Sequence, residues 1–345
     1  MSERSAFIIG GTGQIGTATA ERLLRDGWRV TAAHRGGRST AGVTGATSVI
    51  LDRDDTAALR SAAAGHDVVV DTVAYRPEHA DQLIELAPEV GSLVVISTGS
   101  VAAPLTGTWL EASTGLDDAP RYPDPLDEDV AILDSATDAY SPNKAEVERR
   151  LRATELPISI LRPGAIHGPA SPMLREWYFI KRVLDGRPFA ILAYDGESLF
   201  STTDTRNIAE LIALCADNPG ARLLNAVDEE LLTVAEIGRT VFDLMGHDSP
   251  IRTISGPPRA DGVGDSPWAL AHPLRMPMDR ARRELGYRQA VSYRDGMTDA
   301  IEWSVSALRA AEARGGDWRD AFPIMVSRYG AGEWFPYDAE DAVPG

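Results

Sequence analysis

A tyrosine and a lysine four residues apart are the side chains in this sequence best suited to acid–base chemistry. In Tyr140-Ser-Pro-Asn-Lys144, a helix would place both side chains on one face. Tyrosine, with an ordinary pKa of about 10, is a poor catalyst near neutral pH. A nearby positive charge favours the phenolate, so we expect Lys144 to lower the pKa of Tyr140. The pair is also typical of an ordinary helix face, so its meaning depends on other residues.

A glycine-rich turn, Gly10-Gly-Thr-Gly-Gln-Ile-Gly16, follows the first apolar run and opens a helical pattern. In that context the motif predicts a dinucleotide site. Gly13 lets the backbone approach a pyrophosphate, and Gly16 lets helix and strand pack closely. The first N–H groups of the helix would meet the phosphates. The alternative is a glycine turn without a ligand. We expect cofactor contacts at Gly10, Gly13, Gln14, Ile15 and Gly16.

The residue type at the end of the second expected strand indicates whether the site prefers NAD or NADP. An NAD-preferring site carries an acid about 20 residues after the glycines, but here the strand leads to Arg35. Arg35, with Arg38, would pair with the 2′-phosphate of a ribose. The alternative is a solvated surface arginine. We therefore expect NADP in preference to NAD.

Short apolar runs alternate with helical patterns over the first hundred residues. Such alternation predicts an α/β fold, a Rossmann-like doubly wound parallel sheet, with a smaller C-terminal α/β substrate-binding part. We expect strands at 6–9, 28–31, 48–51, 67–70, 93–96 and 157–162. We expect helices at 14–26, 54–64, 77–87, 173–185, 205–217, 233–246, 278–285 and 293–313, besides the one bearing Tyr140.

The domain boundaries follow from this pattern. We expect an NAD(P)-binding Rossmann domain over 1–170, then a substrate-binding part over 171–315 that partly returns to the sheet. A C-terminal extension over 316–345 would pack on the surface. A stretch rich in Pro and Asp at 99–138 interrupts the rhythm, and loops of this length are usually functional or disordered. We interpret it as a lid over the substrate.

The bulk composition narrows the class of protein. The chain has 345 residues, 43% of them hydrophobic, and a formal net charge of −17. This acidity argues against nucleic acid or an anionic membrane as partner, and no apolar stretch reaches the roughly 20 residues that span a bilayer. No signal peptide is visible, and the single cysteine, Cys215, reads as a buried, inert thiol. We expect a cytoplasmic protein without a metal site.

Four motifs in a fixed order point to a family. They are the glycine turn, Ser97-Thr98-Gly-Ser-Val101, the Tyr140/Lys144 pair, and Arg162-Pro-Gly-Ala-Ile-His-Gly-Pro169. In this order the chain resembles an extended short-chain dehydrogenase/reductase of the NAD-dependent epimerase/dehydratase type. The resemblance runs from residue 5 to about residue 305.

The resemblance implies roles for individual residues. Tyr140 would be the general acid–base, Lys144 would hold the nicotinamide ribose, and Thr98 would fix the reacting oxygen. Ser100 is a candidate substrate hydroxyl or a loop hydrogen-bonder. The remaining cofactor positions would be Asp52 near the adenine, Thr72, Val73 and Ala74 along the cofactor, and Pro163, Ala165 and Ile166 beside the nicotinamide.

The sequence departs from the family pattern at several places. Ala102 and Ala103 stand where the family often has an aromatic wall of the substrate pocket. Ala165 replaces an asparagine that helps to bind the diphosphate of nucleotide sugars. His167 replaces a tyrosine and is a candidate substrate residue or a structural histidine. Thr98 and Tyr140 are 42 positions apart, longer than the family norm. A nucleotide-sugar substrate is therefore in doubt.

The leading hypothesis is an NAD(P)-dependent oxidoreductase or epimerase that acts on a hydroxyl-bearing carbon of a small molecule. Dehydration is disfavoured because Gly99 and Ser100 stand where a dehydratase has an acid–base pair. One alternative is a non-catalytic dinucleotide-binding sensor or scaffold, and another is an RNA-binding relative. Arg175 and Arg206 are candidate anion anchors or surface charges. Relatives often pair through the helix with the tyrosine, so a homodimer is possible.

Overall fold

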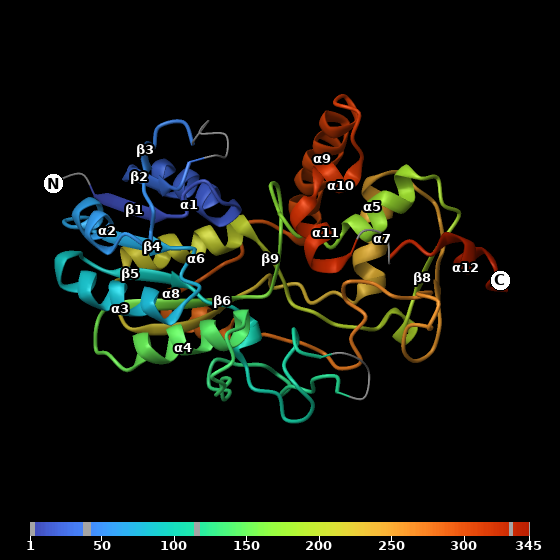
Figure 1. The fold of residues 1–345 in the computed structure, drawn as a ribbon, viewed down its shortest axis with the longest axis horizontal. Coiled ribbons are helices and arrows are strands. Elements are labelled where there is room, and N and C mark those ends of the chain that lie inside the picture. Colours follow the sequence, from blue (N-terminus) through green and yellow to red (C-terminus); the bar gives the residue numbers. More distant parts are fainter. Residues whose placement is uncertain (1–3, 37–42, 114–117, 331–333, 345) are drawn as a thin grey trace.

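The computed structural model describes residues 4–36, 43–113, 118–330 and 334–344. Within these ranges, seven parallel strands form the central sheet, in the order β10-β6-β5-β4-β1-β2-β3 (Figure 1). This confirms the Rossmann-like α/β prediction. The strands are β1 (Ser5–Ile9), β2 (Arg29–His34), β3 (Thr47–Ile50), β4 (Val68–Asp71), β5 (Leu93–Ile96), β6 (Ile158–Pro163) and β10 (Arg222–Ala226).

Helices cover both faces of this sheet, which is why its inner strands are apolar along their whole length. The helices α1 (Gln14–Arg25), α6 (Thr205–Asp217) and α8 (Asp279–Leu285) share a buried core with one face. The helices α2 (Thr56–Ala63), α3 (Pro77–Leu86) and α4 (Tyr140–Arg152) share another with the opposite face. Cys215 is buried in α6, where burial raises the pKa of its thiol to about 11.

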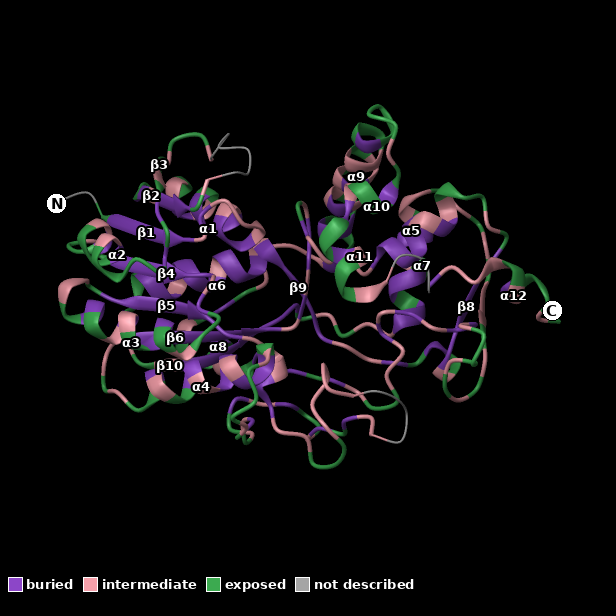
Figure 2. Cartoon of the chain, viewed as in Figure 1, coloured by how far each residue is buried: buried purple, intermediate pink, exposed green. Residues whose placement is uncertain are grey.

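A second core, rich in aromatic rings, forms the other half of the molecule (Figure 2). It is built on α5 (Trp177–Leu184), α7 (Val234–Leu244) and α9 (Tyr293–Glu312). Two small parallel pairs accompany it, β7 (Ala165–His167) with β9 (Thr202–Asp204) and β8 (Ala190–Leu192) with β11 (Ile251–Thr253). Short 3₁₀ turns occur at η1 (Ala87–Glu89), η2 (Gly99–Val101) and η3 (Tyr194–Gly196).

The C-terminal segment belongs to this second core, contrary to our expectation of a surface extension. It forms α10 (Trp318–Ala321), α11 (Pro323–Tyr329) and α12 (Tyr337–Asp341). Its side chains Trp318, Phe322, Met325 and Trp334 are buried together with Trp177. The sequence pattern missed this because the apolar residues are too irregularly spaced to predict a helix face. No helix within the described ranges is both long enough and apolar enough to cross a bilayer.

The long insertion after β5 is packed rather than extended. Ala102 and Ile132 form a β-bridge, and so do Thr106 and Arg121. Asp124 forms an ion pair with Arg275, and Asp129 forms one with Arg280, which fastens the insertion to the segment leading into α8. This packing brings the insertion alongside the N-terminal end of α4.

Candidate active site

Lys144 is almost completely buried on α4, with 2% of its surface exposed. Its Nζ donates a hydrogen bond of 2.6 Å to the carbonyl oxygen of Ile96, the last residue of β5. Burial lowers the pKa of Lys144 to about 8; the nearby Arg53 contributes, and Asp71 opposes the shift. The ammonium is thus held at the carboxyl end of the sheet, where open α/β sheets bind their ligands.

Tyr140, the first residue of α4, behaves differently from our expectation. Its residue surface is 47% exposed, but its hydroxyl is enclosed and hydrogen-bonds with Thr98. This enclosure, with the neighbouring Tyr75 and Glu111, raises the pKa of Tyr140 above its ordinary value. The expected lowering by Lys144 is absent because the Lys144 ammonium contacts a carbonyl instead. Tyr140 is therefore a neutral phenol at pH 7.

Tyr75 is a site residue that the sequence analysis missed. Its ring centroid lies 4.8 Å from the Nζ of Lys144 and 6.1 Å from the ring of Tyr140. Tyr75 directly follows the predicted cofactor segment, in the loop between β4 and α3. A cation over an aromatic face is attracted by the ring, so Tyr75 helps to fix the position of Lys144.

Four oxygen-bearing side chains extend the contacts of Tyr140 into the protein. Thr98 Oγ1 lies 3.1 Å from Ser100 Oγ, which lies 2.7 Å from Ser141 Oγ. Ser141 in turn donates to both carboxylate oxygens of Glu111, each at 2.7 Å. Ser141 and Glu111 were not predicted. Ser141 follows Tyr140 and should point to another helix face, and Glu111 comes from the irregular insertion.

The glycine turn is as compact as the motif predicts. A Cβ at Gly16 would lie 2.2 Å from the carbonyl oxygen of Gly10, and one at Gly11 would lie 2.6 Å from the Cβ of Ala32. Helix α1 begins after Gly13, and no side chain caps its first N–H groups. The side-chain oxygen of Gln14 is buried without a hydrogen-bond partner. Ile15 and Gly16 are buried in the first turn of α1.

The remaining predicted cofactor residues lie at the carboxyl ends of β2, β3 and β4. Arg35 is exposed just after β2 and makes no ion pair with a described residue, whereas Arg38 lies outside the described residues. Asp52 is exposed just after β3. Thr72 donates a hydrogen bond to the carbonyl oxygen of Ile9, beside the glycine turn. Val73 is half-buried and Ala74 is buried next to Thr72.

The segment after β6 lies against the loop that holds Thr98. Pro163 is buried, and its carbonyl oxygen would lie 3.4 Å from a Cβ at Gly99. Ala165 is buried and Ile166 is half-buried in β7. The predicted nicotinamide residues and the predicted catalytic hydroxyl thus meet at neighbouring strand ends, because β5 and β6 pair in parallel.

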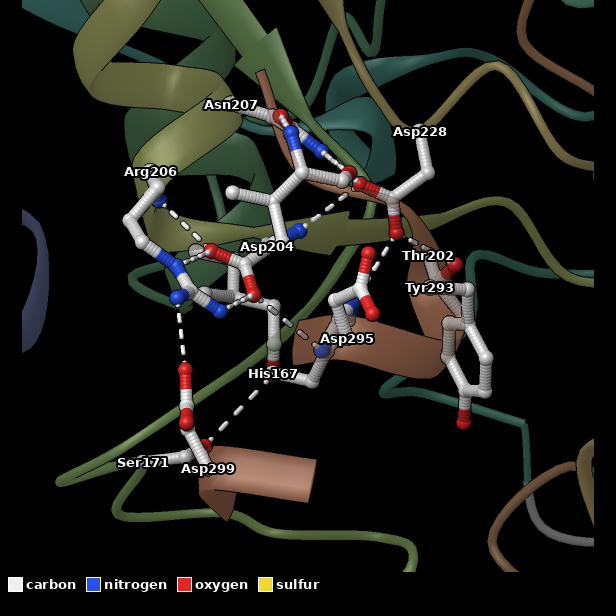
Figure 3. Close-up of polar contacts among 12 residues, drawn as sticks. His167, Ser171, Thr202, Asp204, Arg206, Asn207, Asp228, Tyr293, Asp295 and Asp299 are labelled. Atoms are coloured by element: carbon white, nitrogen blue, oxygen red, sulfur yellow. Dashed lines mark hydrogen bonds and ion pairs between the residues drawn. The ribbon is translucent and has the colours of Figure 1, made fainter. Parts of the chain in front are cut away.

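The surroundings of His167 suit the structural alternative that the sequence left open. It is fully buried, and its Nε2 lies 2.8 Å from the Oδ2 of Asp228 (Figure 3). Burial alone would lower its pKa, but Asp228, with Glu176 and Asp204, raises the pKa of His167 to about 9. The imidazolium is therefore an internal counter-charge, and a part for His167 in substrate binding stays a prediction.

The two arginines considered as anion anchors have different surroundings. Arg206 forms ion pairs with Asp204 and Asp299 and is committed to the network around His167 (Figure 3). Arg175 forms no ion pair with a described residue, and its charge opposes the raised pKa of Tyr140. The described residues contain no group of three or more His, Cys, Asp and Glu side chains that could hold a metal ion.

The chain is similar to several known proteins. Residues 10–173 match a family model described as NAD(P)H-binding. A 3-diazoavenalumate denitrifying reductase from Streptomyces sp is 28% identical over 309 residues, 84% of this chain and 98% of the relative. The chloroplast stem-loop binding protein of 41 kDa b from Arabidopsis thaliana is 24% identical over 323 residues, 87% of this chain and 79% of the relative.

Solved structures share the fold over most of the chain. A UDP-glucose-4-epimerase from Stenotrophomonas maltophila, with bound NAD and formylated UDP-arabinopyranose, superimposes with a TM-score of 0.67. It is 18% identical, and the match covers 90% of this chain and 100% of that structure. At this identity the likeness establishes the fold alone, a parallel sheet joined to a smaller second part.

Proposed function

We propose that this chain is a member of the extended short-chain dehydrogenase/reductase family and an NADPH-dependent reductase of a small molecule. The proposal is supported by the NAD(P)H-binding match over residues 10–173 and by the fold. The observation that carries the proposal is the hydrogen-bonded pair of Tyr140 and Thr98 beside the buried ammonium of Lys144. These groups lie at the carboxyl end of β5, in the same parallel sheet as β1, which leads into the uncapped glycine turn.

The residues of the glycine turn fit a dinucleotide. The close packing at Gly16 shapes the turn as a dinucleotide motif requires, and the uncapped N–H groups of α1 suit a pyrophosphate. The unpartnered oxygen of Gln14 suits a further polar contact. When bound, the nicotinamide supplies the hydride. The residues that would hold the cofactor are Gly10, Gly13, Gln14, Ile15, Gly16, Arg35, Asp52, Thr72, Val73, Ala74, Lys144, Pro163, Ala165 and Ile166.

The protonated state of Tyr140 at pH 7 is the state that the reductive direction requires. A neutral phenol can donate its proton to the oxygen of a carbonyl group as that oxygen gains negative charge. Thr98 would hold the same oxygen by a hydrogen bond, and the ammonium of Lys144 would hold the ribose. Each of these groups is positioned by an element of the fold, α4 or the end of β5, so little reorganisation is needed.

The substrate class follows from the charges near Tyr140. Arg175 is half-buried and without an ion pair among the described residues, and it approaches Tyr140 from the second half of the molecule. It would meet a carboxylate or phosphate of the substrate. The reductase relative is named for 3-diazoavenalumate, a carboxylate anion. Ala165 argues against a nucleotide sugar, the kind of ligand bound by the epimerase neighbour.

The cofactor released on denaturation tests this proposal. We expect the purified full chain to carry no NAD and to bind added NADPH, measured by the quenching or enhancement of nicotinamide fluorescence. NADPH should then be consumed with a diazo carboxylate or a ketone carboxylate as probe. Tightly held NAD together with turnover of UDP-glucose would instead indicate an epimerase. If the protein binds neither dinucleotide, both the reductase and the epimerase functions are contradicted.

A further inference from the structure

His79 of α3 is buried next to the segment that carries Tyr75, with 4% of its surface exposed. Its Nδ1 accepts hydrogen bonds from two backbone N–H groups, that of Tyr75 at 3.0 Å and that of Arg76 at 3.3 Å. Its Nε2 lies 3.0 Å from the Oδ1 of Asp54, which comes from the loop between β3 and α2. A side chain in the first turn of a helix commonly accepts from the residue that precedes the helix, here Arg76. The shorter bond, however, goes to Tyr75.

These contacts determine where the proton of the imidazole lies. A backbone N–H can only donate, so Nδ1 of His79 carries no proton and Nε2 carries one, which it donates to Asp54. Burial and the nearby Arg53 lower the pKa of His79, and Arg76 acts in the same direction. Asp54 and Asp71 oppose this shift without cancelling it. His79 is therefore a neutral imidazole whose acceptor nitrogen faces the backbone.

The backbone that His79 binds places the Tyr75 ring on Lys144. The ring centroid lies 4.8 Å from the Nζ of Lys144. Tyr75 is 47% exposed, so its ring is not fixed by being enclosed in a core. Two residues earlier, Val73 is fixed separately, because its N–H donates a hydrogen bond of 2.8 Å to the last residue of β4. The position of the Tyr75 ring therefore depends on its own backbone, which His79 holds.

We propose that His79 is a positioning residue, whose imidazole, oriented by Asp54, holds the backbone of Tyr75 and thereby keeps the Tyr75 ring on the ammonium of Lys144. The proposal rests on the proposed function only in assigning Lys144 to the cofactor site. Protonation of Nδ1 would turn the acceptor into a donor that faces two other donors. Acid should therefore release the segment from His79.

The lysines of the chain offer a direct reporter of this contact, because there are two of them, Lys144 and Lys181. Full-length protein labelled with ¹³Cε-lysine gives one ε-methylene signal for each in a ¹H–¹³C spectrum, and Lys144→Arg assigns them. The Tyr75 ring should displace the proton signal of Lys144 upfield, and Tyr75→Leu gives the position without the ring. Lys181 lies over Phe335 in the second core, with 5.3 Å between Nζ and the ring centroid. Its signal reports whether each variant is folded.

His79→Ala and His79→Asn form a matched pair of variants. Asn keeps an oxygen acceptor at the covalent position of Nδ1, whereas Ala keeps none. We expect His79→Ala to move the Lys144 signal to its position in Tyr75→Leu. His79→Asn should leave that signal at the wild-type position, and the Lys181 signal should be unchanged in both. A Lys144 signal that stays in place in His79→Ala, or moves equally in the two variants, would overturn the proposal.

An acid titration decides the case in which His79→Ala does not fold. As pH falls below about 6.5 and through the lowered pKa of His79, the wild-type Lys144 signal should move to its position in Tyr75→Leu. Asp54, whose pKa is held low by Arg76, stays ionised over this range. The signal of His79→Asn should stay in place, because Asn does not titrate. Parallel behaviour of the two proteins, where Lys181 shows both to be folded, would overturn the proposal.

The outcome is independent of the proposed function, because every spectrum is recorded without cofactor or substrate. If the wild type fails to bind NADPH, the proposed function is refuted and the result for His79 stands. If His79→Ala leaves the Lys144 signal unchanged in a protein that binds NADPH, the positioning role is refuted and the proposed function stands.

Discussion

The hydroxyl of Tyr140 lies among groups that hold its proton at neutral pH. Enclosure of the hydroxyl, Tyr75 and Glu111 all raise its pKa, and the ammonium of Lys144 is turned to the carbonyl oxygen of Ile96. The spacing of Tyr140 and Lys144 predicted the site, because four residues on a helix define a face. It could not predict the pKa, because Tyr75 and Glu111 come from segments that only the fold brings together.

Arg35 gives a prediction at the scale of one residue. If it meets the 2′-phosphate, Arg35→Ala should weaken NADPH binding by about 10-fold or more, since a charge-assisted hydrogen bond is lost. NADH binding should change little, because NADH has no phosphate there. Arg29→Ala is a matched control, an exposed arginine at the other end of β2. Dissociation constants measured by nicotinamide fluorescence test this prediction. Equal weakening of NADPH and NADH binding would refute the contact between Arg35 and the 2′-phosphate.

At the scale of elements, the central sheet was predictable because apolar runs alternate regularly with helical patterns. The short strands outside the sheet lie in irregular segments and were not predicted. The strand at Leu93–Ile96 and the helix at Thr205–Asp217 occur where the pattern places them. Strands β7 and β9 have three residues each, too short for a periodic signal, yet they carry His167 and Asp204. The network in Figure 3 therefore joins β7, β9 and α6 through charged side chains. The local sequence periodicity does not predict these contacts.

His167 makes the stability of this junction depend on pH. Its pKa is raised to about 9 in the folded protein, from about 6.5 when unfolded. The stabilisation is complete below about pH 6.5 and is lost as pH rises through about 9, by about 3 kcal/mol in total. Urea unfolding should show the free energy of unfolding of the wild type falling over this range relative to His167→Gln. A parallel pH dependence in the two proteins would refute the protonated state.

At the scale of the whole molecule, the C-terminal segment closes the second core. Arg182 of α5 is 1% exposed and pairs with Glu340 of α12, which is fully buried. Arg182 also donates a hydrogen bond of 2.8 Å to the carbonyl oxygen of Trp334. The chain end is thus tied to the helix that follows Arg175, and the two termini lie at opposite ends of the long axis (Figure 1).

This buried pair predicts a large effect from a small change near the chain end. Glu340→Gln leaves Arg182 as a buried charge without a carboxylate, which should destabilise the protein by about 3–5 kcal/mol. Asp341→Asn, at a neighbouring carboxylate whose side chain is 53% exposed, should cost at most about 1 kcal/mol. Thermal and urea unfolding of the two variants measure the loss of stability. If both variants lose equally little, the C-terminal segment does not stabilise the second core.

Turnover by Tyr140→Phe tests the central claim most directly, that this phenol is the acid of a hydride-transfer reaction. The substitution removes one hydroxyl and leaves the ring, so NADPH should bind with unchanged affinity. The rate of NADPH oxidation with the carboxylate probes should fall by about 10²- to 10⁴-fold, the contribution of a general acid. A variant that binds NADPH and oxidises it at the wild-type rate would contradict the account.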